Sequence, residues 1–229
     1  MRSPLSSALA EFAGTAVLVC VVVGSGIMGA ALSQDVGVAL LINALSTIMA
    51  LALLILVLGP VSGAHFNPAV TLVELGARRT SGRVAVGYLA AQVLGGITGA
   101  IAANLMFDLP AVQISANERL TPGTFLGEVI ATAGLIIVIG VLARRGQAVL
   151  IPIAVAGWIG AAYFFTSSTS FANPAVTIGR IFSDTFAGIA PASVAPFVGA
   201  QLLGAVLGAL AVIALTRAVP AVERVEAAQ

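Results

Sequence analysis

The stretch Ser170-Phe171-Ala172-Asn173-Pro174-Ala175-Val176-Thr177 decides the fold, because its last five residues occur twice in the chain. The same Asn-Pro-Ala-Val-Thr lies within Ser62-Gly63-Ala64-His65-Phe66-Asn67-Pro68-Ala69-Val70-Thr71, 106 residues earlier. Asn is a good helix N-cap and Pro is tolerated at the first helical position, so each copy predicts the start of a helix. About ten helix-compatible residues follow, which span roughly 15 Å, half of a hydrocarbon core of about 30 Å. We therefore expect two half-membrane helices whose N-termini face each other at the midplane.

The composition indicates a protein that crosses a membrane as helices. Residues are 59% hydrophobic and 8% charged, whereas soluble domains carry about 25% charged residues. The net charge of +1 gives no indication of nucleic-acid binding. The predicted fold class is an all-α membrane protein with six transmembrane helices plus two half-membrane helices. Six apolar runs have the length of spanning helices rather than of barrel strands: 6–32, 36–59, 84–107, 124–143, 148–166 and 194–217.

The chain is built as a repeat of two halves, about 5–107 and 123–217. Leu9-Ala10-Glu11-Phe12-Ala13-Gly14-Thr15 opens the first half, and Phe125-Leu126-Gly127-Glu128-Val129-Ile130-Ala131-Thr132 opens the second. Ala90-Ala91-Gln92-Val93-Leu94-Gly95-Gly96 likewise matches Gly199-Ala200-Gln201-Leu202-Leu203-Gly204-Ala205. An odd number of crossings per half puts the copies in opposite orientations, so this is an inverted repeat. We expect one transmembrane domain over 1–229, close helix packing at these glycines, and a disordered tail at 218–229.

The arginines predict the orientation, because cytoplasmic loops carry an excess of basic residues. With the N-terminus inside, only Arg119 and Arg180 lie on the outer side. Both termini are therefore expected in the cytoplasm. The eight arginines on the cytoplasmic side are Arg2, Arg78, Arg79, Arg83, Arg144, Arg145, Arg217 and Arg224.

The segments 59–66 and 166–172 predict a pore. Irregular backbone inside a membrane persists only where it is buried in protein or lines a water-filled cavity. The carbonyl groups of these segments would line a path, and two helix N-termini with the amides of Asn67 and Asn173 would lie at its centre. A cation meets two positive dipole ends there, while a neutral polar molecule finds donors and acceptors. The residues therefore favour a pore for small neutral polar molecules.

The two boxes, Asn67-Pro68-Ala69 and Asn173-Pro174-Ala175, set in an inverted six-span repeat, resemble the aquaporin and aquaglyceroporin family over about residues 5–217. The resemblance implies a passive channel in the bacterial cell membrane, a homotetramer in the lipid bilayer with one pore per protomer, and no cofactor. Bacterial relatives with the ending Asn-Pro-Ala-Val-Thr-Ile resemble channels linked to arsenic handling.

Three ionisable residues lie where a membrane disfavours them. Glu11 and Glu128 interrupt apolar runs, each at about 2.5–3.5 kcal/mol if unpartnered. They could relay protons, but the resemblance implies that each accepts hydrogen bonds from the backbone of its Asn-Pro loop, with Gln92 and Gln201 packed nearby. His65, two residues before the first box, is interpreted as pore-lining rather than purely structural. Metal binding there is not expected, because no second ligand lies nearby.

The chain departs from the family at the filter of the pore. Family members usually carry Arg directly after the second box, where this chain has Val176, and the Asp that follows in glycerol facilitators is here Thr177. Family spacing implies a filter of small residues and hence a wide, uncharged constriction unless another side chain fills it. Its members by that spacing are Thr47, Ser170, Val176 and a position between Ala161 and Tyr163, for which Ala161 is taken and Tyr163 kept as the alternative.

Arg180 is the candidate to fill that constriction. It lies four residues after Val176, one turn on and on the same helical face. It could reach the outer vestibule or pair with Asp184 a further turn along. It could also extend to the outer headgroups, as arginines at helix ends commonly do.

The sequence thus favours a passive channel for glycerol-like solutes, water and neutral metalloids such as arsenite. The alternative is an ion-coupled secondary transporter, since broken helices in inverted repeats build those as well. That function needs a cation-coordinating site at the midplane, where the two boxes present donors. The sequence contains no pair of nucleophile and base and no metal cluster, so we do not expect an enzyme.

Overall fold

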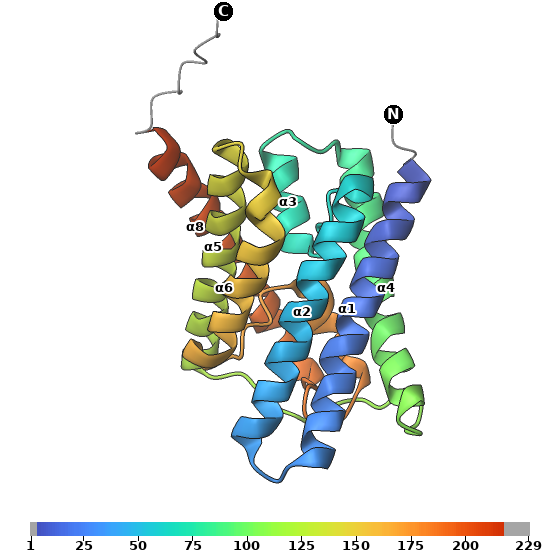
Figure 1. Ribbon diagram of the computed structural model, residues 1–229. Coiled ribbons are helices and arrows are strands. Elements are labelled where there is room, and N and C mark those ends of the chain that lie inside the picture. Colours follow the sequence, from blue (N-terminus) through green and yellow to red (C-terminus); the bar gives the residue numbers. More distant parts are fainter. Residues whose placement is uncertain (1–3, 218–229) are drawn as a thin grey trace, which may run out of the picture.

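The computed structural model describes residues 4–217 of the 229-residue chain, so the expectation for the tail 218–229 lies outside the described residues. The described part is helical with connecting loops (Figure 1). Its elements are α1 (Pro4–Leu32), α2 (Val36–Ser62), α3 (Pro68–Gly76), α4 (Gly82–Met106), α5 (Pro122–Arg144), the 3₁₀ turn η1 (Ala148–Leu150), α6 (Ile151–Phe165), α7 (Pro174–Gly179), the 3₁₀ turn η2 (Arg180–Phe182) and α8 (Pro191–Arg217).

The predicted spans are confirmed. Six helical stretches of 18 to 29 residues are long and apolar enough to cross a membrane, and they coincide with the six apolar runs to within about three residues. Two boundaries differ from the prediction. Helix α2 continues through Pro60 to Ser62, so the irregular backbone begins at Gly63 rather than at 59. Helix α7 has six residues before it tightens into η2, so the second half-helix is shorter than the ten residues expected.

Polar side chains fix where the helices begin. The carboxylate of Asp35 accepts hydrogen bonds from the first turn of α2, and the hydroxyl of Ser81 accepts one at the start of α4. Thr121 forms a capping box on α5. The half-helices begin at the two boxes, where Asn67 and Asn173 are the N-caps of α3 and α7. A capping side chain satisfies backbone N–H groups that a helix start leaves unpaired.

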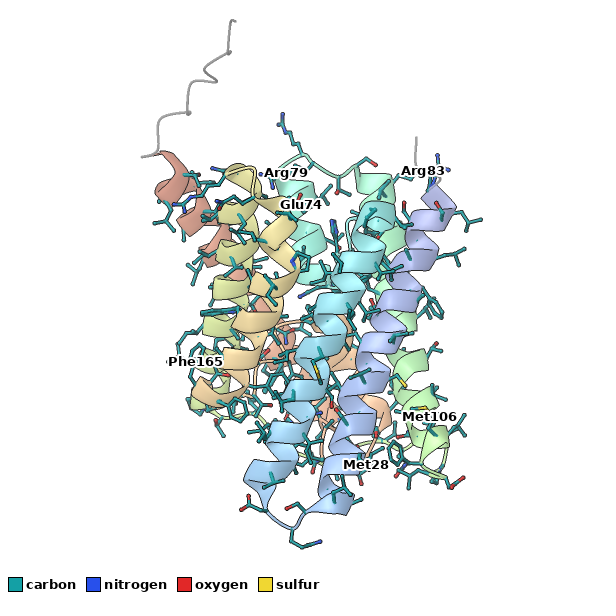
Figure 2. All side chains as sticks on the ribbon, viewed as in Figure 1. Met28, Glu74, Arg79, Arg83, Met106 and Phe165 are labelled. Carbon is teal, nitrogen blue, oxygen red and sulfur yellow. The ribbon has the colours of Figure 1, made fainter. Side chains whose placement is uncertain are left out.

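The two halves form one bundle around the half-helices. Helix α1 packs against α4 and α5 against α8, while α2 meets α6 between the halves. Helices α3 and α7 enter from opposite ends and meet in the middle (Figure 1). The start of α1 and the end of α8 lie at one end of the bundle, together with Arg79 and Arg83, whereas Met28 and Met106 lie at the other (Figures 1 and 2). We call the first the arginine-rich end and the second the opposite end.

Glycines bring the paired helices into backbone contact. A Cβ atom at Gly95 or Gly99 of α4 would meet carbonyl oxygens of α1, and one at Gly204 or Gly208 of α8 would meet carbonyl oxygens of α5. These positions match in the two halves, as expected from the small-residue pattern. Gly199 is the exception, since no atom lies within 4 Å of the position of its Cβ. The packing role expected for Gly199 is therefore wrong.

We predict opposite effects of Ala at two glycines of α4. At Gly96 an added Cβ would lie 2.7 Å from the carbonyl oxygen of Ala175, so Gly96→Ala should push α7 away and cost about 1–3 kcal/mol. At Gly87, where nothing lies within 4 Å, Gly87→Ala should leave stability unchanged or raise it, because Ala favours the helix. The measurement is the unfolding temperature of each purified variant in detergent. Equal shifts for the two variants would contradict this packing.

Candidate functional site

One cavity of about 470 Å³ lies at the centre of the bundle and is lined by both halves. Its lining includes Glu74 and Arg79, which lie at the arginine-rich end (Figure 2). It also includes Asn67 and Asn173 in the middle and Arg180, which follows α7 toward the opposite end. Both loops that precede the half-helices contribute to the wall. The structure therefore brings the asparagines of both Asn-Pro-Ala boxes to the wall of a single cavity.

The two asparagines are locked to each other's loops. Each side-chain oxygen accepts a hydrogen bond from the backbone N–H two residues on, at 2.9 Å for Asn67 and 3.0 Å for Asn173. The Nδ2 atom of Asn67 donates to the carbonyl of Ala172 at 2.8 Å, and that of Asn173 donates to the carbonyl of Phe66 at 2.7 Å. An amide NH₂ group has two hydrogens, so each asparagine keeps one donor beyond this bond. Two fixed donors therefore lie at the cavity wall.

The loops before the boxes share a rarely adopted backbone. Three equivalent pairs of residues have φ between 48° and 94°, the left-handed region that costs a non-glycine residue about 1–2 kcal/mol. Only one of the six is glycine, so tertiary contacts must hold the loops in place. Apart from that glycine, no residue type in these loops predicts this conformation. The pairs are Gly63 with Thr169, Ala64 with Ser170, and Phe66 with Ala172.

Glu11 supplies those contacts in the first half. Its carboxylate is fully buried and accepts four hydrogen bonds. The donors are the hydroxyl of Ser62 at 2.6 Å, the backbone N–H groups of His65 at 2.9 Å and Phe66 at 2.6 Å, and the side-chain amide of Gln92 at 2.7 Å. A carboxylate with this many donors is satisfied inside the membrane.

Glu128 holds the second loop in the same way. It accepts from the backbone N–H of Phe171 at 2.9 Å, from that of Ala172 at 2.8 Å and from the amide of Gln201 at 2.6 Å. The same amide lies 2.8 Å from the hydroxyl of Thr177. Sequence reasoning missed this threonine and its counterpart after the first box, although the repeated Val-Thr was a signal. Neither glutamate belongs to the cavity wall, so the geometry gives no support to a proton relay.

His65 lies at the cavity wall between the first box and the arginine-rich end. Its Nδ1 is 3.0 Å from the hydroxyl of Thr71. Its ring packs edge-on against Tyr88, with 5.3 Å between the ring centroids. The imidazole is therefore fixed in orientation with part of its surface toward the cavity.

The residues expected at the filter are brought together with one correction. Thr47, Ser170, Val176 and Tyr163 line the cavity, and the hydroxyl of Tyr163 donates to that of Thr47 at 3.2 Å. Ala161 is exposed and not part of the wall, so its assignment to the filter is wrong. The physical reason is the helical period, since residues two apart in a helix point to different sides. The hydroxyl of Ser170 is buried without a partner among the described residues.

Arg180 is buried at the same wall, with 3% of its surface exposed. Its guanidinium carbon lies 3.4 Å from the centroid of the Phe171 ring, and its Nε donates to the carbonyl of Ala187. The expected extension to headgroups and the expected pairing with Asp184 are both wrong. The carboxylate of Asp184 instead accepts from the backbone N–H of Ala116 at 2.9 Å.

Arg119 is a second arginine near the same ring, with its guanidinium carbon 5.4 Å from the centroid of Phe171. Its Nε donates to the carbonyl of Gly188 at 2.6 Å and its Nη2 to that of Phe186 at 2.8 Å. Arg119 thus fastens the loop between the halves to the segment after η2. Sequence reasoning missed this role, because the partners are backbone carbonyls that carry no motif.

Six spans, two half-helices and a cavity between the two ends of the bundle define a membrane channel. The family description "Major intrinsic protein" matches residues 2–170. The chain is 48% identical to the aquaglyceroporin AqpS of Rhizobium meliloti over 200 residues, which cover 86% of this chain and 84% of the relative. It is 32% identical to aquaporin Z of Brucella melitensis over 222 residues, 90% of this chain and 96% of the relative. The chain therefore belongs to the major intrinsic protein family.

The fold agrees with that assignment. The solved structure of the aquaglyceroporin from Plasmodium falciparum superposes with a TM-score of 0.74, covering 95% of this chain and 97% of the other, at 23% sequence identity. The likeness at this identity is one of fold. Family and fold together identify a passive channel for small neutral solutes.

We predict that the carboxylate of Glu11 is needed for the first loop to hold its shape. Glu11→Gln would turn an NH₂ group toward donors and break at least one buried bond, at about 2–4 kcal/mol. The unfolding temperature in detergent should fall, and water permeability in proteoliposomes should fall with it. Glu118→Gln, in the exposed loop between the halves, is the matched control and should change neither. Wild-type stability of Glu11→Gln would contradict the role of Glu11.

Proposed function

We propose that this channel conducts glycerol-like solutes, water and neutral metalloids such as arsenite in the form As(OH)₃. The observation that carries the proposal is the asparagine pair at the centre of the cavity. The side chains of Asn67 and Asn173 each donate one hydrogen bond and accept at least one, and each presents a further N–H donor at the wall. Hydroxyl or water oxygens accept from such donors, and a cation is disfavoured by them.

The proposed filter supports hydroxylated solutes. It consists of Thr47, Tyr163, Ser170 and Val176, which combine three hydroxyl groups with one apolar side chain. Such a ring matches a small polyol, whose hydroxyl groups and carbon skeleton need polar and apolar contacts respectively. The names of the relatives in Rhizobium meliloti and Brucella melitensis, an aquaglyceroporin and an aquaporin, agree with a glycerol and water channel.

The remaining residues have supporting roles in this proposal. His65 lines the path toward the arginine-rich end, and Glu11 and Glu128 hold the two loops that carry the boxes. The chain acts as one channel domain, without catalysis and without a cofactor. An ion-coupled transporter is the alternative, and it would need a cation site where the asparagine donors lie.

We also propose that the channel is a homotetramer in the bacterial cell membrane with both termini in the cytoplasm. The start of α1 and the end of α8 lie at the arginine-rich end, and basic residues favour the cytoplasmic side. Many large apolar side chains are exposed on the helices, which supports contact with lipid and with neighbouring copies.

Passive flow is tested on proteoliposomes by stopped-flow light scattering for water and glycerol, with arsenite uptake in parallel. We expect shrinkage and re-swelling several-fold faster than in protein-free liposomes, and fluxes that a protonophore leaves unchanged. Uptake against a gradient that collapses with the protonophore would instead establish the coupled transporter. Absence of glycerol and arsenite flux beside normal water flux would restrict the channel to water.

The orientation is tested with single cysteines in a Cys20→Ala background. Gln34→Cys lies in the exposed loop at the opposite end, and Gln147→Cys lies in the exposed loop at the arginine-rich end. A membrane-impermeant maleimide added to intact cells should label residue 34 alone, and both residues after the cells are opened. Labelling of residue 147 alone in intact cells would reverse the assignment.

A further inference from the structure

Arg180 brings a positive charge to the cavity wall that also contains Val176. Val176 and Arg180 are one helical turn apart, and both line the cavity. Four residues advance a helix by about 6 Å, so the Cα of Arg180 lies that much nearer the opposite end. Side chains on a helix point back toward its N-terminus, and an arginine is long enough to cover the preceding turn. The small Val176 side chain leaves room for it.

The guanidinium is held in one orientation. It stacks on Phe171, and its Nε is bonded to the carbonyl of Ala187. The ring of Phe171 is fixed in turn by Phe197, at 5.3 Å between centroids and an angle of 68° between planes. Arginine has five N–H donors in a rigid fork. The four donors on the Nη atoms have no partner among the described residues, so they are available to a solute in the cavity.

The guanidinium of Arg180 is not in direct contact with an acidic side chain of the described residues. Within the described residues Arg180 forms no salt bridge; the ion pair present at the wall joins Glu74 and Arg79 at the other mouth. Arg119 lies near the same Phe171 ring and adds a second positive charge. The buried carboxylate of Glu128 attracts this charge through space without forming a salt bridge to it. Because little water screens a buried cation, Arg180 repels other cations and favours oxygen acceptors.

The repeat shows independently that this position faces the path. Arg180 is the seventh residue after Asn173, and Glu74 is the seventh after Asn67. Both belong to the cavity wall. The same register therefore points into the path in both half-helices, once with a negative charge and once with a positive one. Arg180 thus occupies a position that the fold directs to the pore in both halves.

We propose that Arg180 is the residue that determines selectivity at the opposite end, acting over Val176 from one turn further along the chain. Its fork donates to solute oxygens, narrows the opening together with Tyr163 and excludes cations. The preferred solutes are then small, neutral and oxygen-rich. This inference rests on the proposed function, since it concerns the filter of the same channel.

The first variant is Arg180→Leu, measured in proteoliposomes with water, glycerol, the larger polyol erythritol and the cation methylammonium. Loss of the fork removes one or two hydrogen bonds and the charge. The ratio of erythritol to glycerol permeability should rise by about two- to tenfold, and methylammonium should become measurably permeant. Arg145→Leu, at the exposed arginine-rich end of α5, is the matched control and should keep both wild-type values.

The second variant relocates the charge. In Val176→Arg combined with Arg180→Leu the guanidinium starts one turn earlier, and it should exclude methylammonium again and lower the polyol ratio toward the wild-type value. Val176→Arg alone places two guanidinium groups in one space, so it should slow the flux of every solute. If Arg180 has no role in the filter, Val176→Arg alone and Val176→Arg with Arg180→Leu will show the same solute permeabilities, which would contradict the proposal.

The outcomes separate the two proposals. If the wild type conducts neither water nor glycerol, the proposed function is wrong. If the wild type conducts them and folded Arg180→Leu keeps the wild-type polyol ratio and excludes methylammonium, the inference about Arg180 alone is overturned. Should Arg180→Leu fail to fold, Arg180→Lys and Arg180→Gln decide. Exclusion of methylammonium by Lys but not by Gln supports the charge, and exclusion by both overturns it.

Discussion

Two non-helical loops reach the middle of the bundle, and the carboxylates of Glu11 and Glu128 make this possible. A backbone N–H left unpaired in hydrocarbon costs several kcal/mol. Each carboxylate satisfies two of them and is itself bonded to a glutamine from the third long helix of its half. Charged acceptors suit this task, because their bonds are about twice as strong as neutral ones. The left-handed backbone of both loops, the facing half-helices and the central donors all depend on this support.

Much of the architecture could be predicted from the sequence, because its signals are periodic or repeated. The six apolar runs mark the spans, and two Asn-Pro-Ala boxes in an inverted repeat mark the half-helices. The residues of the filter are harder to predict from the sequence. The choice between Ala161 and Tyr163 is a matter of two residues, and two residues turn a helical side chain by about 200°. Tyr163 is at the wall and Ala161 is exposed. Arg180 could not be placed either, since its direction depends on a tertiary partner, Phe171, that lies before the box.

The two halves differ at several equivalent positions, including some at the cavity wall. His65 and Phe171 are equivalent positions, yet one presents an imidazole to the wall while the other presents a ring on which a guanidinium stacks. Packing differs as well. Gly179 lies against Gly96, so α7 sits tightly on α4, whereas the equivalent Val73 and Ala205 line a second cavity of about 530 Å³ beside α3. The half-helix at the opposite end is thereby held more closely than its counterpart.

That tighter support matters for a selective pore, because selectivity requires donors that do not move to suit each solute. A flexible arginine would move away from an incoming cation or form a hydrogen bond to a nearby carbonyl. Two contacts hold the Arg180 side chain, one with the Ala187 carbonyl and one with the Phe171 ring. Its backbone follows directly on α7, which packs closely against α4 at Gly179 and Gly96. A small residue at 176 is then compatible with a charged filter. A solute responds to where the guanidinium lies in the pore, whichever residue of the chain carries it. Under the proposed role of Arg180, the charge at the constriction comes from residue 180, one turn after the valine at 176.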